Sequence, residues 1–288
     1  MGSFNFGRGM AAASAVAIFS VLACTATAVA KPAPSPKLKS NSVLIVDSSD
    51  SSVLYSRNSD VAAPIASITK LMTALVVLDA NQPLDEPIEI TQAEQDLPKA
   101  GFSRLLVGTV LTRGDLMHLA LMSSENRAAH ALGNTYPGGM PAMVSAMNAK
   151  AAALGMTSAH FVDPTGLSSE NVASPEDLSK LVIAASRNST IREYSTDKSY
   201  TVRVRSRLVE FRNTDKLVAN PTWNIIVQKT GYISEAGKCL VMEAVIEGRN
   251  VVIVLLDSLG KYTRLADAKR VKSWMESSGN ARVRVSMR

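Results

Sequence analysis

The order of strand-like and helix-like segments is the feature that most constrains how this chain folds. Two short apolar runs, 42–46 and 53–55, flank a polar stretch and predict a β-hairpin near the start of the folded part. Helical patterns follow as far as about residue 196, and strand-like runs then return. Strands at both ends with helices between them predict an α+β fold, in which the N-terminal hairpin closes the edges of an antiparallel β-sheet.

The individual segments follow from periodicity and from turn residues. A nearly all-apolar stretch from Ser67 to Ala80 predicts a buried helix, because a surface helix keeps a polar face. Ser174, followed by Pro175 and two acidic residues, predicts another helix start. The further expected helices cover 111–122, 125–132, 141–154 and 262–275, and the further expected strands cover 200–204, 224–230, 238–247 and 250–256.

Residues 1–30 predict a secretory signal peptide that is not part of the fold. They carry one charged residue, Arg8, and then an uncharged apolar run that ends in the small-x-small pattern Ala-Val-Ala. We expect cleavage after Ala30 and export to the periplasm. Two alternatives stay open. The run is long enough for a retained membrane anchor, and Cys24 follows a sequence that partly matches a lipoprotein processing site.

The flanking stretches differ in composition from the region between them. Residues 31–40 are Pro-rich and cationic, which predicts an extended linker. Residues 278–288 form a basic tail, which leaves 41–277 as the folded domain. The chain stops soon after the last expected helix. We therefore expect no membrane anchor at this end, and at most peripheral contact with a membrane.

Composition excludes several classes of function. The 31 Lys and Arg against 25 Asp and Glu give a net charge of +6 without a clustered basic stripe, so nucleic acid is not an expected partner. The chain contains neither a C-x-x-C pair nor H-E-x-x-H, so we expect no metal and no cofactor. The three histidines, His118, His130 and His160, lie in contexts without matching acids, and no G-x-S-x-G surrounds a serine. A Ser-His-Asp hydrolase is therefore disfavoured.

The sequence Ser67-Ile-Thr-Lys70 is the first motif that carries chemistry. Residues i and i+3 share a helix face, so the Lys70 amine can reach the Ser67 hydroxyl. A serine becomes a good nucleophile when a neighbour takes its proton, and a lysine can do so only when it is neutral. Burial in apolar surroundings lowers a lysine pKa from its usual value of about 10.4 toward that condition.

S-x-x-K occurs three times, so context has to separate the copies. The copy at Ser195 lies in a polar stretch that offers no apolar wall to its lysine, and the copy at Ser258 contains a glycine at a strand end. Only Ser67 begins a long apolar helix, and backbone N–H groups at a helix start favour a developing oxyanion. We therefore take Ser67 as the candidate nucleophile.

Two further motifs carry chemistry: S-x-N is a common pattern in this chain, and K-T-G occurs once. Ser124-Glu-Asn126 is one of six S-x-N sequences, but it interrupts two helical runs, where paired polar side chains could project into a cleft. Lys229-Thr230-Gly231 occurs once and ends a strand-like run. There a cation and a hydroxyl at a sheet edge suit a substrate carboxylate, and a glycine permits close approach.

Together, S-x-x-K, S-x-N and K-T-G resemble the signature of penicillin-binding proteins and class A-like serine β-lactamases. The stretches PIASITKLMTALVVLDA, LALMSSENRAAHAL, FVDPTGLS and QKTGYISEAGKCLVM resemble low-molecular-mass penicillin-binding proteins, the serine DD-peptidases of family S11. Within this family they most resemble the D-alanyl-D-alanine endopeptidases of the penicillin-binding protein 7 type. The resemblance extends from about Asn41 to Trp274. It implies a serine β-lactamase/DD-peptidase-like fold, with an all-helical subdomain within about 71–160.

The resemblance also implies acyl transfer through an acyl-enzyme. Ser67 would be the acylated nucleophile, Lys70 its general base and Ser124 the relay of a proton to the leaving amine. The oxyanion hole would be the N–H groups of Ser67 and of Tyr232, which follows Gly231. The implied substrates are peptide cross-links of peptidoglycan, and β-lactams would act as covalent inhibitors.

Three substrate-binding roles are implied in the same way. Asn126 would hydrogen-bond the substrate peptide, Thr230 would hold the substrate carboxylate, and Lys229 would keep Lys70 and Ser124 electrostatically poised.

Several functional alternatives remain at this point. A carboxypeptidase releases free D-alanine with the same catalytic set, so the motifs leave it open beside the endopeptidase. A β-lactamase needs a group that activates water, and E-x-x-L-N does not occur between Ser124 and Lys229. A non-catalytic wall-peptide-binding module would not need a buried Ser/Lys pair.

Overall fold

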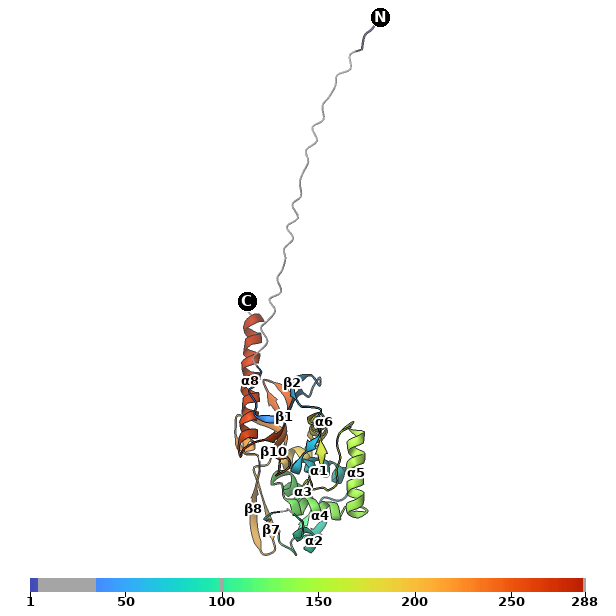
Figure 1. The fold of residues 1–288 in the computed structure, drawn as a ribbon, viewed down its shortest axis with the longest axis vertical. Coiled ribbons are helices and arrows are strands. Elements are labelled where there is room, and N and C mark those ends of the chain that lie inside the picture. Colours follow the sequence, from blue (N-terminus) through green and yellow to red (C-terminus); the bar gives the residue numbers. More distant parts are fainter. Residues whose placement is uncertain (5–34, 99–100, 287–288) are drawn as a thin grey trace. The chain divides into compact units, whose positions relative to one another are not determined.

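Five antiparallel strands form the main sheet of the computed structural model, which describes residues 1–4, 35–98 and 101–286. The strand order is β2-β1-β11-β10-β9 (Figure 1). The bounds are β1 Ser40–Asp47, β2 Val53–Arg57, β9 Asn224–Ile233, β10 Gly237–Ile246 and β11 Arg249–Ser258. The α+β class predicted from the sequence is confirmed. Nearly all of the predicted signal peptide, and residues 31–34 of the predicted linker, lie outside the described residues.

The predicted hairpin forms, but it occupies one edge of the sheet only. Strand β1 pairs with β2 on one side and with β11 on the other, while β9 forms the opposite edge. The sheet edge that carries K-T-G is therefore not closed by the hairpin. The fold also begins inside the stretch predicted as a linker, because Leu38 is buried and β1 starts at Ser40, whose N–H donates to Asp267 at 2.7 Å.

Alternating side chains give the sheet two buried faces. Val43 and Ile45 pack on one face with Val271 and Met275 of α8 (Thr263–Ser286). Leu44, Val46 and their neighbours on β10 and β11 face the larger core, which most of the other helices share. Because both faces are covered, the middle parts of β1, β10 and β11 are mostly apolar and show little of the period-2 alternation of a half-exposed strand.

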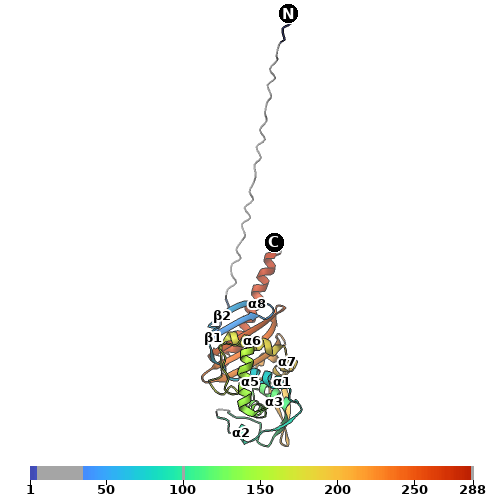
Figure 2. The same cartoon turned by 90° about the vertical axis from the view of Figure 1, so that its right-hand side faces the viewer.

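A group of helices packs on the face of the sheet opposite α8 (Figures 1 and 2). The helices are α1 Thr69–Asp79, α2 Gln92–Gln95, α3 Arg113–Met122, α4 Asn126–Asn134, α5 Gly139–Ala153, α6 Pro175–Ser186 and α7 Ser189–Thr196. Helix α6 starts where Ser174 and Asp177 form a capping box, as the sequence predicts. The helix predicted from Ser67 is divided, because Ser67 lies in a 3₁₀ turn, η1 Ala66–Ile68, and α1 begins after it.

Small two-stranded sheets interrupt the helical region, so it is not all-helical. The first pairs β4 Pro87–Glu89 with β5 Val110–Thr112, within the residues expected to form the helical subdomain. The others pair β3 Ala63–Pro64 with β6 Val172–Ala173 and β7 Ser199–Val204 with β8 Arg207–Arg212, and a second 3₁₀ turn, η2, covers Lys216–Ala219.

Helix α8 contacts β1, β10 and β11 and extends to Ser286, past Met275, where the sequence pattern ends the helix. Part of the predicted basic tail is therefore helical backbone. None of the helices in the described part of the chain combines the length and apolarity needed to cross a membrane.

Candidate active site

The Lys70 amine lies beside the Ser67 hydroxyl at the start of α1. Its Nζ donates to Ser67 Oγ at 2.8 Å, to Asn126 Oδ1 at 2.7 Å and to the Thr165 carbonyl at 2.6 Å. The i,i+3 spacing predicted from the sequence therefore brings the pair into contact, and Asn126 of the second motif joins them. All three acceptors are neutral groups.

Burial changes the ionisation of this amine. Lys70 is fully buried, and removal from water lowers its pKa from 10.5 to about 7, although the charges of Asp163 and Glu125 act in the opposite direction. A shift of this size corresponds to about 5 kcal/mol against the charged form. Near neutral pH a large share of the amine is therefore unprotonated and able to accept a proton.

Backbone strain and close packing fix the turn that carries Ser67. Ala66 has a positive φ of 48°, which a non-glycine residue adopts at a cost, and its carbonyl accepts a hydrogen bond from Thr69 Oγ1 at 2.8 Å. Gly166 packs directly on this turn, since a Cβ there would lie 2.0 Å from the Ala66 oxygen. Only glycine fits, and the loop that supplies the Thr165 carbonyl is held against η1.

Ser124 and Lys229 form the second contact pair of the site. Ser124 lies in the turn between α3 and α4 with a positive φ of 60°. Its Oγ accepts a hydrogen bond from Lys229 Nζ at 2.9 Å, and the same amine donates to the Thr230 carbonyl at 2.9 Å. Burial lowers the Lys229 pKa well below its usual value, and the nearby charges of Lys70 and Arg264 lower it further.

The K-T-G segment brings strand β9 against the turn of Ser67. A Cβ on Gly231 would lie 2.9 Å from the Ile65 oxygen and 3.2 Å from the Ser67 nitrogen, so a side chain there would force the two segments apart. Tyr232 follows and is 56% exposed, with the Lys238 amine 3.3 Å from its ring centroid. The predicted residues of all three motifs therefore meet in one region.

Three residues of this region have no role in the sequence prediction. Thr165 contributes a backbone carbonyl, and such a contact leaves no side-chain signal. Thr214 Oγ1 lies 2.6 Å from Thr230 Oγ1, and Arg264 donates to the Gly231 carbonyl at 3.0 Å. Thr214 and Arg264 lie within the stretches EFRNTDKLV and GKYTRLADA, but a single sequence does not predict their contacts across the fold.

The other S-x-x-K copies lack this arrangement. Ser195 is buried and donates to the Arg192 carbonyl, while Lys198 is exposed. Ser258 Oγ lies 2.7 Å from Ser40 Oγ, and Lys261 is exposed. Their context distinguishes them from Ser67 as the sequence predicted.

The expectation that the histidines lack acidic partners is wrong for two of them. His130 Nδ1 lies 2.9 Å from Glu94 Oε1, and His118 Nε2 lies 3.1 Å from Asp197. Glu94 is 36 positions from His130 and Asp197 is 79 positions from His118, so no local sequence pattern predicts either pairing. Within the described ranges, no group of three or more His, Cys, Asp or Glu side chains comes together to hold a metal ion.

Residues 26–260 match a protein-family model, peptidase family S11, described as D-alanyl-D-alanine carboxypeptidase. The chain belongs to this family. A D-alanyl-D-alanine endopeptidase of Pseudomonas aeruginosa is 50% identical over 242 residues, which cover 83% of this chain and 78% of the relative. An endopeptidase of the same description from Escherichia coli is 46% identical with the same coverage. A D-alanyl-D-alanine carboxypeptidase of Streptomyces sp. strain K15 is 31% identical over 238 residues, which cover 77% of this chain and 81% of that protein.

Solved structures support the same S11 fold. The Streptomyces K15 DD-transpeptidase superposes with a TM-score of 0.77 at 27% identity, over 85% of this chain and 99% of that one. A D-alanyl-D-alanine carboxypeptidase from Mycobacterium tuberculosis superposes with a TM-score of 0.78 at 29% identity, over 85% and 93% of the two chains. The DD-peptidase-like fold expected from the motifs is confirmed.

Proposed function

We propose that this chain is a serine-type D-alanyl-D-alanine endopeptidase that hydrolyses peptide cross-links of peptidoglycan through an acyl-enzyme on Ser67. The observation that carries the proposal is the contact between the buried Lys70 amine and Ser67 Oγ at 2.8 Å. A lysine with a pKa of about 7 is a competent base near neutral pH, which is what activation of a serine requires.

Acylation begins with proton transfer from Ser67 to the neutral Lys70 amine. Ser67 Oγ attacks the carbonyl carbon of the D-alanine, and the carbonyl oxygen becomes an oxyanion. The N–H groups of Ser67 and Tyr232 stabilise that charge, and the close packing of Gly231 on the Ser67 nitrogen supports this assignment.

Collapse of the tetrahedral species breaks the C–N bond, and the leaving amine needs a proton. We assign the relay to Ser124, whose Oγ accepts a hydrogen bond from Lys229 Nζ at 2.9 Å in the same site. The Ser124 hydroxyl gives its proton to the amine and is reprotonated from the proton that Lys70 took. Water then attacks the ester, which releases the acyl product and restores Ser67.

Substrate binding is assigned to the neighbouring groups. Thr230 holds the carboxylate beside the scissile bond, Asn126 hydrogen-bonds the peptide, and Lys229 keeps Lys70 and Ser124 electrostatically poised. The Thr214 hydroxyl, 2.6 Å from that of Thr230, orients the latter.

The relatives support the endopeptidase over the carboxypeptidase, because the two at 50% and 46% identity carry the endopeptidase name. Both activities use one chemistry and differ in the amine that leaves. Digestion of purified sacculi with the enzyme, followed by mass analysis of the products, separates them. We expect loss of cross-linked dimers without release of free D-alanine; release of free D-alanine with intact dimers would replace the endopeptidase by the carboxypeptidase.

Acylation itself is tested with benzylpenicillin, because a β-lactam resembles the D-Ala-D-Ala terminus. Intact mass is expected to show one adduct on the wild type and none on Ser67→Ala. Absence of the adduct, or its survival in the variant, contradicts the assignment. Slow turnover of nitrocefin distinguishes the peptidase from a β-lactamase.

Export is part of the proposal. We infer that residues 1–30 act as a signal peptide cleaved after Ala30 and that the enzyme works in the periplasm, where its substrate lies. N-terminal sequencing of the protein from a periplasmic fraction tests the cleavage point, and a Cys24-linked lipid is the alternative result.

A further inference from the structure

One acceptor of the Lys70 amine is a backbone carbonyl, and the peptide group that supplies it is held from both sides. The carbonyl of Thr165 accepts from Lys70 Nζ at 2.6 Å. The N–H of the same peptide group belongs to Gly166 and donates to Asp163 Oδ1 at 2.7 Å. The C=O and N–H of a trans peptide group point in opposite directions. This group, the bridging peptide, therefore connects the Asp163 carboxylate to the Lys70 amine.

Asp163 is the centre of the loop that carries the bridging peptide. Its Oδ1 also accepts from Thr165 N at 2.6 Å and from Thr165 Oγ1 at 2.5 Å. Its Oδ2 accepts from Ser168 N at 3.1 Å and from Asn171 Nδ2 at 3.0 Å. Each of these groups donates, which suits an ionised carboxylate because both of its oxygens accept. One side chain thus sets the position of the Thr165 carbonyl.

Asn171 ties the same loop to the turn that carries the nucleophile. Its side chain is fully buried, and its Nδ2 donates to the Asp163 carbonyl at 3.0 Å as well as to the carboxylate. Its own carbonyl accepts from Ile65 N at 3.0 Å, two residues before Ser67. Ser67 and the Thr165 carbonyl therefore belong to one hydrogen-bonded unit.

The three neighbours of Lys70 Nζ determine how a neutral amine lies. A neutral amine has two N–H groups and one lone pair. The acceptors from Asn126 and Thr165 are amide oxygens, which only accept, whereas the Ser67 hydroxyl can also donate. The amide oxygens then take both N–H groups, and the lone pair faces the Ser67 proton. Ser67 Oγ also lies 3.5 Å from the Thr165 carbonyl, but Nζ is closer at 2.8 Å.

The charges that act on this amine come from several elements. Burial lowers the Lys70 pKa to about 7, and the carboxylates of Asp163 in the loop and Glu125 before α4 act in the opposite direction. Lys229 of β9 is the other buried amine of the site, and its pKa is lowered by burial and then by the charges of Lys70 and Arg264. Removal of the Asp163 charge should therefore lower the Lys70 pKa further.

We propose that Asp163 is a positioning residue for the general base: through the bridging peptide, it orients the Lys70 amine so that the lone pair faces Ser67 Oγ. Asp163 acts through this peptide and makes no bond to the substrate. The inference rests on the proposed function, because it assumes that Ser67 is acylated with Lys70 as the base.

Asp163→Asn tests the proposal, because it keeps the size of the side chain and removes its charge. The new NH₂ group would face a donor, either Gly166 N or Asn171 Nδ2, so the loop should loosen. The plateau rate of acylation by benzylpenicillin should fall by about 10- to 100-fold, the cost of a misplaced catalytic group. The midpoint of the pH profile should move to a lower pH than in the wild type. Stopped-flow acylation, with active sites counted by intact mass, measures both.

The midpoint distinguishes positioning from a merely structural role, because partial unfolding lowers the number of active sites without moving it. Glu170→Gln is the matched control, since it removes a carboxylate from the same loop but from an exposed position. Its rate should stay within about twofold of the wild type, and its midpoint should not move. An unmoved midpoint in Asp163→Asn, or a plateau rate within twofold of the wild type, overturns the proposal.

Neutron diffraction on deuterated wild-type crystals at pH 9 tests the orientation without a variant, and it decides the matter if Asp163→Asn does not fold. We expect the Nζ deuterons to point at the oxygens of Asn126 and Thr165, and the Ser67 deuteron to point at Nζ. An Nζ deuteron directed at Ser67 Oγ would overturn the proposal.

Failure of this inference is distinct from failure of the proposed function. If the wild type forms no adduct with benzylpenicillin, the proposed function fails. If the wild type is acylated with the expected loss of rate at low pH, and Asp163→Asn keeps its rate and midpoint, only the positioning role of Asp163 is overturned.

Discussion

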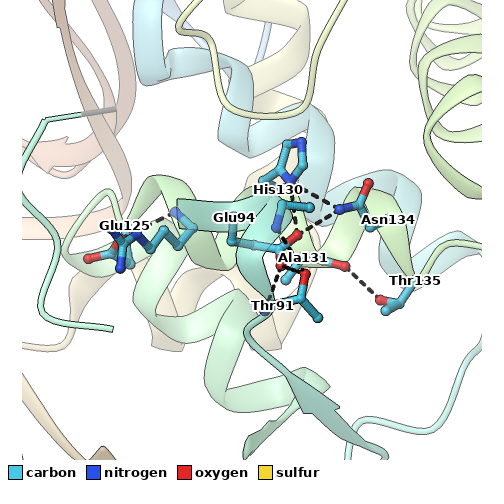
Figure 3. A network of polar contacts seen from close by, with 9 residues as sticks. Thr91, Glu94, Glu125, His130, Ala131, Asn134 and Thr135 are labelled. Atoms are coloured by element: carbon cyan, nitrogen blue, oxygen red, sulfur yellow. Dashed lines mark hydrogen bonds and ion pairs between the residues drawn. The ribbon is translucent and has the colours of Figure 1, made fainter. Parts of the chain in front are cut away.

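Two buried ionisable side chains, Lys70 and Glu94, contact helix α4 at different turns, and burial affects their ionisation in opposite ways. At the start of α4, Asn126 contacts Lys70, whose three acceptors are neutral, and the Lys70 pKa falls to about 7. One and two turns later, His130 and Asn134 contact Glu94, which is also buried (Figure 3). There, hydrogen-bond donors converge on the carboxylate and stabilise its charge.

The difference separates a reactive group from a fixed one. A buried cation without a contacting carboxylate is close to losing its proton, which suits a base. A buried carboxylate with several donors keeps its charge over the whole physiological range and holds its neighbours in place. We therefore expect substitutions at the first group to change rate and substitutions at the second to change stability.

The largest expected effect is on acylation by Lys70→Ala. Without the amine, Ser67 loses the base that contacts its hydroxyl, and the rate of acylation by benzylpenicillin should fall by about 1,000-fold or more. The free energy of unfolding should change by less than about 1 kcal/mol, because the cost of burying the amine offsets its hydrogen bonds. Intact-mass kinetics and denaturant titration measure the two quantities. Acylation within tenfold of the wild type would show that another group is the base.

Glu94→Gln is expected to act on stability. Loss of the charge weakens the bonds from Thr91, His130 and Asn134, so the free energy of unfolding at pH 7 should fall by about 2 kcal/mol. The folded-state pKa of Glu94 lies below the usual glutamate value of 4.5, so the charge stabilises the fold above pH 4.5 and its contribution disappears as the pH falls toward about 2. Denaturant titrations at pH 7 and pH 3 should therefore show a smaller difference at the lower pH. Equal stability of the two proteins at pH 7 would contradict the comparison.

The pH dependence of wild-type acylation is the next effect in size. The base must be neutral, and the Lys70 pKa is lowered to about 7, so the rate should fall about tenfold per pH unit below that value and level off above it. Stopped-flow acylation by benzylpenicillin from pH 5 to 9 measures the profile. A flat rate between pH 5 and 8 is incompatible with Lys70 as the base.

Sequence patterns predicted the parts of this site that are local and missed those that are not. Ser67 and Lys70 are three residues apart on an apolar segment, so their contact is contained in the sequence. The pairing of Glu94 with His130 and the carbonyl of Thr165 beside Lys70 arise only when distant segments pack together. The same reason explains the fold, because the hairpin was predicted from adjacent residues while its position at a single edge depends on β11.

The smallest expected effect comes from the S-x-x-K copy at Ser195, which tests whether pattern or surroundings make the site. Lys198 of that copy is exposed and follows the end of α7. Water solvates its amine, so we expect this lysine to take no part in the reaction at Ser67. Lys198→Ala should leave the acylation rate within twofold of the wild type and the free energy of unfolding within about 0.5 kcal/mol. The same assays used for Lys70→Ala give the comparison directly. A loss of acylation in Lys198→Ala would show that an exposed lysine contributes to the reaction, and burial of the amine would then not be what selects the catalytic lysine.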